Sequence, residues 1–114
     1  MKVNELSFGS INIDGKEYFK DIVINKGKIK KRKKKESKKF RSQFGHTPLS
    51  TLENIPWDCK KLIIGTGHSS ALPVMKEVNK KAKKKGVELE LMSTPDAILH
   101  IHEKDTNFIL HLTC

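Results

Sequence analysis

The sequence predicts an α/β domain of the mixed α+β kind, built on a mixed sheet with helices on at least one of its faces. A strand, a helix and a second strand follow one another over residues 62–91, which is the pattern of a crossover unit. Short apolar runs near the N-terminus and a last one at 107–112 supply further strands. With 114 residues the chain has the length of one domain, so residues 1–114 are expected to fold as a unit.

The N-terminal quarter has the pattern of short paired strands. The runs SINI and EYF flank Asp14-Gly15, a dipeptide that supplies the positive φ angles of a tight hairpin turn. The apolar run DIVI at 21–24 predicts a third strand, and the residues at 25–27 turn the chain after it.

The middle of the chain predicts a parallel strand–helix–strand unit. Residues 62–65 form a short apolar run bounded by turn residues, as in a buried strand. Apolar residues recur at helical spacing from 72 to 85, and Gly86 stands where a helix C-cap belongs. Residues 87–91 alternate as a strand does. The crossover between the two strands should be parallel and right-handed.

Two shorter helices are predicted from capping residues. Ser50 with Glu53 three positions later fits a capping box, and Pro56 would end the helix that it starts. Ser93 or Thr94 would cap a helix over 95–98, with proline in its first turn.

The net charge of +10 is concentrated in one segment. Residues 28–41, KIKKRKKKESKKFR, hold 10 of the 23 Lys and Arg residues and only Glu36 among the 13 acidic ones. Such a segment attracts nucleic acid or acidic protein surfaces, with a strong dependence on salt. It lacks the interleaved aromatic residues of a base-stacking platform, and charge runs are usually solvated.

Nucleic-acid binding through this segment is therefore kept as an alternative hypothesis, and residues 28–44 are a candidate flexible stretch. The candidate basic patch comprises Lys30, Lys31, Arg32, Lys33, Lys34, Lys35, Lys38, Lys39 and Arg41.

The stretch LIIGTGHSSALPV at 62–74 places a glycine-bounded turn between a strand and a helix. A dinucleotide-binding loop would need a third glycine where Ser70 stands, and an acidic residue at the end of the next strand. A lone G-x-G does not carry that interpretation, so no cofactor is assigned.

The same turn resembles the nucleophile elbow G-x-S-x-G, with Ser69 as the nucleophile and alanine in the last position. Asp96 or Asp105 and then His111 follow in a triad order. The chain is too short for the sheet of a full α/β-hydrolase, so a weak hydrolase is only an alternative hypothesis and no catalytic residue is assigned.

The simplest interpretation is that Gly65 and Gly67 allow a tight turn and that Ser69 or Ser70 caps the following helix. A helix N-terminus also offers free N–H groups to an anion. A small anion or ligand is thus a further alternative, with Gly65, Gly67, His68, Ser69 and Ser70 as candidates.

The histidines and cysteines do not form a metal-ligand pattern. Cys59 and Cys114 lack the paired spacing of a zinc site. His100 and His102 are expected on a helix, where positions two apart point away from each other. On a continuing strand His111 would not share a face with Cys114. No metal site is therefore predicted.

The chain resembles the domain of unknown function family 498. GSINIDGKEYFKDIVI carries the likeness at the start, and a basic stretch leads to GHTPLS. It continues through LIIGTGHSSALPV and STPDA to the terminal HLTC. His46, Gly65, Gly67, Ser69, His111, Thr113 and Cys114 fall on positions that match the family pattern.

The resemblance implies a single domain with a central mixed sheet of about five strands, helices on its faces, an N-terminal β-hairpin layer and an antiparallel last strand. It implies no enzymatic activity and no cofactor. Relatives act through protein partners in respiratory-complex assembly and cell signalling, so the leading expectation is a non-catalytic protein-binding or assembly module. The chain departs from its relatives in its lysine density between 28 and 39.

The N-terminus lacks the apolar region of a signal peptide, and no apolar run is long enough to span a membrane. A cytoplasmic location without a membrane partner is the resulting expectation. The oligomeric state and the identity of a partner are not predicted.

Overall fold

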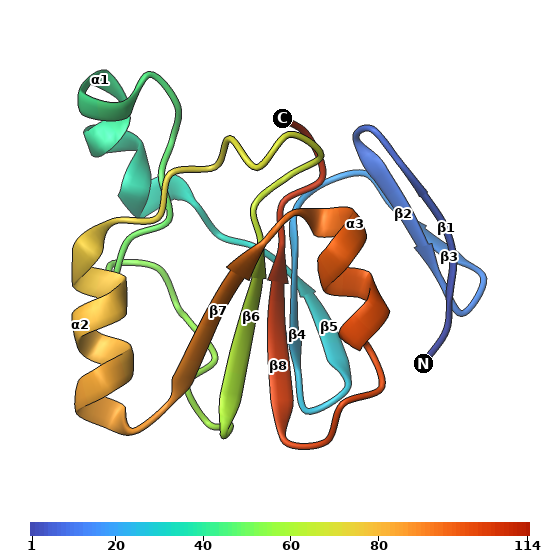
Figure 1. Cartoon of the computed structure of the whole chain (residues 1–114). Helices are drawn as coiled ribbons and strands as arrows, with labels where there is room; N and C mark the ends of the chain where they lie inside the picture. Colours follow the sequence, from blue (N-terminus) through green and yellow to red (C-terminus); the bar gives the residue numbers. More distant parts are fainter.

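The central element is a five-stranded mixed sheet with strand order β5-β4-β8-β6-β7 (Figure 1). The computed structural model describes all residues from Met1 to Cys114. The five strands are β4 (Ile22–Asn25), β5 (Lys28–Lys31), β6 (Lys61–Gly65), β7 (Glu88–Met92) and β8 (Thr106–Leu110). The predicted mixed sheet of about five strands is confirmed.

An N-terminal antiparallel sheet of three strands forms a separate layer: β1 (Val3–Ser7), β2 (Ser10–Ile13) and β3 (Lys16–Tyr18). Asp14 and Gly15 connect β2 to β3 with φ angles of 52° and 86°, as the dipeptide predicted. The pattern of apolar residues did not predict β1 or the lysine-rich edge strand β5.

The last strand corrects one expectation. β8 is antiparallel to β4, but it runs parallel to β6, with Phe108 opposite Ile63. The sheet is mixed because β8 lies between β4, to which it is antiparallel, and β6, to which it is parallel.

The predicted parallel pairing is confirmed: β6 pairs parallel with β7, and α2 (Lys76–Lys85) connects them. Gly86 ends α2 in the left-handed region with φ 71°, as expected for a C-cap. The helix begins at Lys76 and not at residue 72. Leu49 explains the delay, because its amide donates to Pro73 O and its carbonyl accepts from Met75 N, which keeps residues 73–75 extended.

Two predictions of helix N-caps were wrong. Ser69 and Ser70 do not cap α2, whose N-cap is Met75 without a side-chain bond. Residues 50–55 form a turn and no helix. The Glu53 carboxylate that would close the capping box binds Arg32 at 2.8 Å, a partner 21 residues away.

The later helix follows the prediction more closely. Ser93 is the N-cap of α3 (Thr94–Ala97), and its hydroxyl accepts from the Asp96 amide. The 3₁₀ helix η2 (Ile98–His100) continues from it. The lysine-rich stretch forms β5, the 3₁₀ helix η1 (Lys35–Phe40) and α1 (Arg41–Phe44), while its flexibility stays a prediction.

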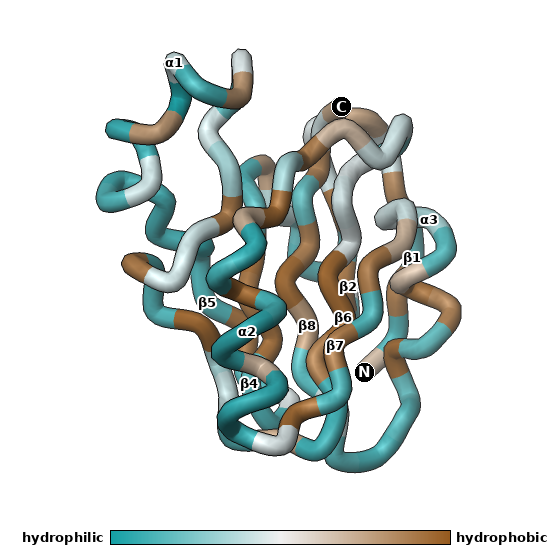
Figure 2. The backbone as a smooth tube through the Cα atoms, turned by 60° about the vertical axis from the view of Figure 1, so that its left-hand side comes forward, coloured by the Kyte–Doolittle hydropathy of each residue, from teal (hydrophilic) through white to brown (hydrophobic).

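Two apolar clusters fill the two faces of the central sheet. One joins Ile11 and Ile13 of the N-terminal sheet to Ile63 and Phe108, with Ala97 of α3. The other packs α2 through Val78 against Leu62, Ile64 and Ile109, together with Leu49 and Ile55. Figure 2 shows the apolar residues gathered in the central strands, while most of α2 is hydrophilic. No helix has the length and apolar character needed to cross a membrane.

Candidate functional site

Residues 111–114 leave the sheet after β8 and lie against the glycine turn that follows β6. His111 donates its amide to Gly65 O at 2.9 Å, and the amides of His68 and Ser69 donate to Thr113 O and Cys114 O at 3.0 and 2.8 Å. A Cβ on Gly67 would lie 2.4 Å from Thr113 O, so only glycine fits this contact.

These hydrogen bonds concern the same backbone amides that were predicted to bind an anion at the glycine turn. The turn lies several residues before α2 and is not a helix N-terminus. The amide of Gly67 donates to the Thr94 hydroxyl at 2.9 Å, and the amides of His68, Ser69 and Ala71 already have backbone oxygens as acceptors. The turn therefore holds the protein's own C-terminal segment.

The imidazole of His111 lies between a carboxylate and a hydroxyl. Its Nδ1 is 2.7 Å from Asp21 Oδ2, and its Nε2 is 3.3 Å from Thr113 Oγ1. Because an ionised carboxylate only accepts hydrogen bonds, Nδ1 carries a proton toward Asp21, and Nε2 faces the Thr113 hydroxyl. The carboxylate beside His111 is thus Asp21, and neither Asp96 nor Asp105 of the hydrolase hypothesis.

A buried network of hydrogen bonds and ion pairs holds the Asp21 carboxylate in place. Arg32, only 3% exposed, donates to Asp21 Oδ2 at 2.9 Å and to both carboxylate oxygens of Glu53 at 2.8 and 2.9 Å. The Ser37 hydroxyl donates to Glu53 at 2.6 Å. This chain of bonds connects Asp21, directly before β4, and Arg32, directly after β5, with η1 and the C-terminal segment.

Burial and these partners act in opposite directions on Asp21 and Arg32. Burial raises the pKa of Asp21, but the hydrogen bond and charge of His111, the Leu112 amide and the charge of Arg32 together bring that pKa below 3.8. For Arg32, burial lowers the pKa, and the carboxylates of Glu53 and Asp21 raise it above its ordinary value. Both groups therefore remain charged inside the domain.

In front of this network is a small cavity of about 190 Å³, which we call the C-terminal pocket. Its wall combines basic residues with the end of the chain: Arg32, Lys34, Arg41, His46, Thr47, Ala71, Leu72, His111, Thr113 and Cys114. The pocket brings together His46, His111, Thr113 and Cys114, which the family resemblance had selected from distant parts of the sequence. No Asp or Glu lines it.

The sequence matches one protein-family model over most of its length. The model of a family described as "Protein of unknown function (DUF498/DUF598)" matches residues 3–102. The chain belongs to this family. Among curated proteins, none matches it.

Solved structures share the DUF498 fold over nearly the whole chain. The conserved hypothetical protein PH1505 from Pyrococcus horikoshii OT3 is 29% identical, with a TM-score of 0.83 over 100% of both chains. A protein titled MT938 is 23% identical, with a TM-score of 0.72, covering 98% of this chain and 97% of the other. An outer membrane protein from Bartonella henselae is 14% identical, with a TM-score of 0.66, covering 98% and 94%. The last two show similarity of fold alone.

The basic segment of this DUF498 chain does not form one continuous patch. Arg32 is buried, Lys34 and Arg41 line the C-terminal pocket, and Lys30, Lys31 and Lys33 line a different groove beside Trp57. Lys35, Lys38 and Lys39 lie on the exposed surface of η1. Sequence reasoning treated these residues as equivalent, although a single arginine within a lysine run is itself a signal for a planar, bidentate contact.

Sequence reasoning missed Asp21, the partner of both His111 and Arg32. Its only local signal is a carboxylate placed directly before a buried strand. The histidine pair His100 and His102 is not part of the site, because His100 contacts Glu103 at the other end of the sheet. The chain has no group of three or more His, Cys, Asp or Glu side chains placed to hold a metal ion.

Proposed function

We propose that the C-terminal pocket binds a small ligand carrying a phosphate group. The supporting observation is its charge: three of its ten lining residues are Lys or Arg, two are His, and none is acidic. The nearest carboxylates, Asp21 and Glu53, are already bonded to Arg32 and His111. A ligand phosphate would therefore meet cations, with no acidic side chain in the pocket wall.

The residues divide into two groups by what they can contact. Lys34 and Arg41 are exposed and form no ion pair with any acidic side chain, so both are free to reach a ligand. The ring of His46 adds a further polar group at the wall. Arg32 acts as a positioning residue, because it holds Asp21 and through it the ring of His111.

The size of the pocket restricts the ligand. About 190 Å³ is below the roughly 300–1,000 Å³ of sites for drug-sized molecules. The pocket therefore fits a free phosphate or one phosphate group of a larger molecule. Guanidinium groups such as that of Arg41 suit this geometry, since they can donate two parallel hydrogen bonds to phosphate oxygens.

The test is a titration with inorganic phosphate followed by NMR of the histidine rings and backbone amides. We expect saturable shifts at His46, His111 and Thr113. Arg41→Ala should weaken binding by about tenfold or more, because a hydrogen bond to a charged group is lost. Lys16→Ala, a matched loss of charge on the N-terminal sheet, should leave binding unchanged. Shifts that never saturate, or that spread along all exposed lysines, would contradict the proposal.

Protein binding is a second candidate, and exposed aromatic residues favour it. Phe8 and Phe19 are 69% and 70% exposed. Since Ser7 pairs with Ser10 and Ile11 with Tyr18, both lie at the same end of the N-terminal sheet. Large exposed apolar side chains that cluster are typical of interaction surfaces.

A capture experiment with nuclease-treated lysate tests this second candidate. The intact chain should retain a discrete partner that the double variant Phe8→Ser, Phe19→Ser loses. Leu99→Ser, which changes another exposed apolar residue near α3, is the control and should retain the partner. Equal capture by all three proteins would exclude a docking role for the two phenylalanines.

A further inference from the structure

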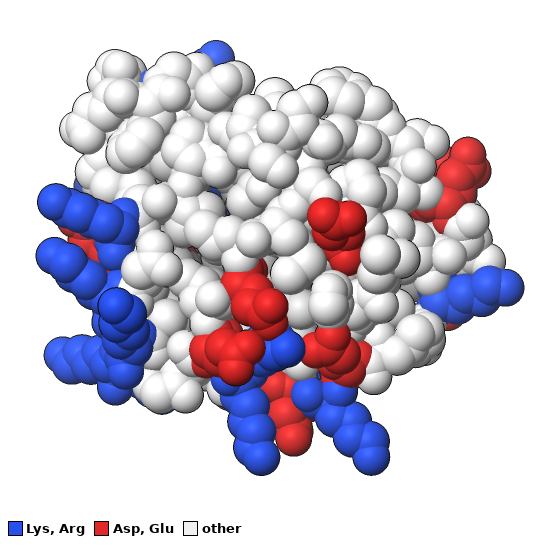
Figure 3. All heavy atoms as spheres, viewed as in Figure 1, with Lys and Arg blue, Asp and Glu red and all other residues white.

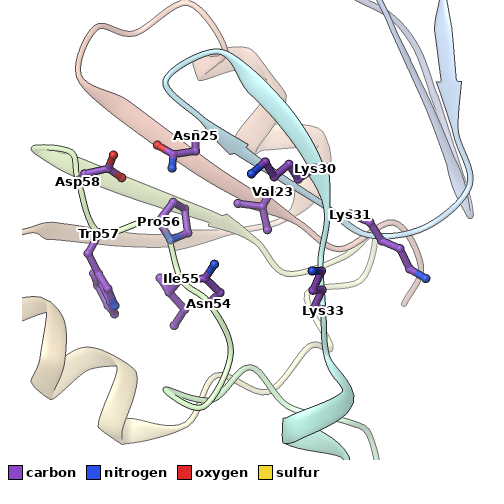
Figure 4. Close-up of a pocket in the computed structure, with 10 residues that line it drawn as sticks. All are labelled: Val23, Asn25, Lys30, Lys31, Lys33, Asn54, Ile55, Pro56, Trp57 and Asp58. Carbon is purple, nitrogen blue, oxygen red and sulfur yellow. The ribbon is translucent and has the colours of Figure 1, made fainter.

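A groove beside Trp57 lies apart from the C-terminal pocket and is larger, at about 610 Å³ (Figure 4). We call it the Trp57 groove. Its lining combines aromatic, apolar, amide and basic side chains: Val23, Asn25, Lys30, Lys31, Lys33, Asn54, Ile55, Pro56, Trp57 and Asp58. In Figure 4 Trp57 stands on one side and the three lysines on the other, with Val23, Ile55 and Pro56 between them.

The strand register explains why lysines and apolar residues meet there. Val23 pairs with Lys30 across the β4–β5 hairpin, so both side chains lie on the same face of the sheet. That face is the one that carries the α2 cluster, but α2 lies beside β7, away from β4 and β5 (Figure 1). The loop at residues 54–58 covers the face instead, and the groove lies between this loop and the hairpin.

Trp57 is half-buried and packs its inner side against the α2 cluster. An indole held in this way gives a flat surface of fixed orientation. Its neighbour Pro56 is buried and adds a second rigid apolar surface. Such surfaces suit the flat face of a nucleobase, because stacking needs little change in the protein.

The charge of the groove is positive. Lys30, Lys31 and Lys33 have no ion-pair partner, whereas the single acid in the lining, Asp58, lies 3.4 Å from Lys26. More lysines follow on the α2 side, where Lys80, Lys81 and Lys84 line a shallow depression with Glu77. Figure 3 shows basic side chains projecting along the edge of the molecule where α2 lies.

We propose that the Trp57 groove binds single-stranded nucleic acid, with a base stacked on Trp57 and the adjacent phosphates on Lys30 and Lys33. Asn54 is exposed in the lining of the groove, and its side-chain amide can bond the edge of the base. Stacking explains the aromatic wall, and phosphate contacts explain the unpaired lysines. A paired duplex hides its base faces and would use only the lysines. This inference does not depend on the phosphate site in the C-terminal pocket.

Trp57 is the only tryptophan of the chain, so its fluorescence reports the groove directly. The probe is a mixed-sequence DNA strand of about 12 nucleotides, within the usual range of single-strand sites. We expect saturable quenching at low salt. The logarithm of the binding constant should fall with the logarithm of salt concentration by roughly 0.7 for each phosphate contacted.

Variants separate stacking from charge. With a labelled strand and anisotropy detection, Trp57→Leu should weaken binding by roughly 5- to 150-fold, the effect of removing one stacked base. The double variant Lys30→Ala, Lys33→Ala should weaken binding and reduce the salt slope. Lys2→Ala with Lys16→Ala removes the same charge from the N-terminal sheet and should leave both unchanged. Arg41→Ala, in the other pocket, should also leave strand binding unchanged.

Four results would overturn the proposal. They are an absence of quenching at low salt, unchanged binding by the Lys30, Lys33 variant, equal affinity for a duplex of the same sequence, and displacement of the strand by polyglutamate at matched charge concentration. The last result would assign the groove to acidic peptides. Because both lysines are exposed, the lysine variant keeps the test valid even where Trp57→Leu loses its fold.

Discussion

Arg32 differs from its lysine neighbours because its charge is inside the domain. The side chain is 2% exposed, and its ion-pair partners Asp21 and Glu53 are 11% and 4% exposed. Removing one member of such a set leaves buried charges without a partner, which costs more than the set itself contributes. The network therefore fixes the geometry of β4, β5 and the C-terminal segment more than it adds net stability.

Arg32→Ala should lower the free energy of unfolding by about 3–5 kcal/mol, the usual cost of breaking a buried ion pair. Urea denaturation followed by circular dichroism measures this change. Lys33→Ala, one position along and exposed, should stay within about 0.5 kcal/mol of the parent chain. Similar losses in both variants would show that the Arg32 bonds contribute little.

Asp21 makes the stability of the domain depend on acidity. Its pKa in the folded state lies below the ordinary 3.8, so the folded state binds the proton less readily than the unfolded chain. The stabilisation is complete above the ordinary value and is lost as the pH falls through the folded-state value. Below about pH 4, the parent chain should therefore lose stability that Asp21→Asn has already lost.

Urea midpoints measured from about pH 7 to about pH 2 test this prediction. Asp21→Asn should be less stable than the parent chain at neutral pH and show a flatter acid limb. Asp96→Asn, a change at an exposed carboxylate of α3, should keep the parent's profile. Parallel acid limbs for the parent chain and Asp21→Asn would remove Asp21 as the source.

At the scale of single elements, the sequence predicted the turns, helix caps and strands that depend on residues close to one another in the chain. The Asp14-Gly15 turn, the Gly86 cap, the Ser93 cap and the alternating strand β7 all formed as expected. Long-range bonds decided the rest. The Glu53 carboxylate accepts from Arg32 instead of closing a capping box, and the backbone bonds of Leu49 keep residues 73–75 extended.

The candidate site was predictable only in part. The family resemblance selected His46, His111, Thr113 and Cys114, and the fold brings these four to one pocket. Asp21 could not be found, since it lies 90 positions before His111 and the pairing of β4 with β8 brings the two residues together. Trp57 was missed as a neighbour of the lysines for the same reason: the loop at 54–58 and the β4–β5 hairpin line one groove only in the folded chain.

The contact between β6 and α3 leaves no room at Gly65. A Cβ there would lie 2.9 Å from Thr94 Oγ1 and 3.0 Å from Leu110 Cδ2. Thr94 Oγ1 also accepts from Gly67 N and donates to His111 O, so it cannot move freely. Gly65→Ala should therefore destabilise the domain by about 1–3 kcal/mol through overpacking.

Thermal or urea unfolding measures this effect, and Gly45→Asn is the matched control. Gly45 has φ 73° with open space around its Cβ position, and asparagine tolerates that region, so the control should cost well under the clash at Gly65. Since Thr94 also bonds His111, Gly65→Ala should in addition weaken phosphate binding in the C-terminal pocket. A normal stability for Gly65→Ala would mean that α3 moves away at no cost.

At the scale of the whole molecule, one sheet joins two cores. Along β6, Ile63 faces the cluster that holds Ile11 and Ile13, while Leu62 and Ile64 face the α2 cluster that Trp57 packs against. Neither cluster is complete without the central strands. Loss of one should therefore remove the support of the other, and the domain should unfold in a single cooperative step.

Ile13→Ala tests this coupling from the N-terminal layer. Ile13 is 1% exposed, so truncation to alanine should cost about 2–5 kcal/mol through lost burial and the remaining cavity. Trp57 fluorescence reports the opposite face, and far-UV circular dichroism reports the whole chain. Both unfolding transitions should shift to lower urea by the same amount and coincide, whereas Leu99→Ala, at a side chain 79% exposed, should shift neither. If the Trp57 transition kept its parent midpoint while the dichroism signal split, the N-terminal sheet would be an independent unit that packs on the domain without stabilising its other face.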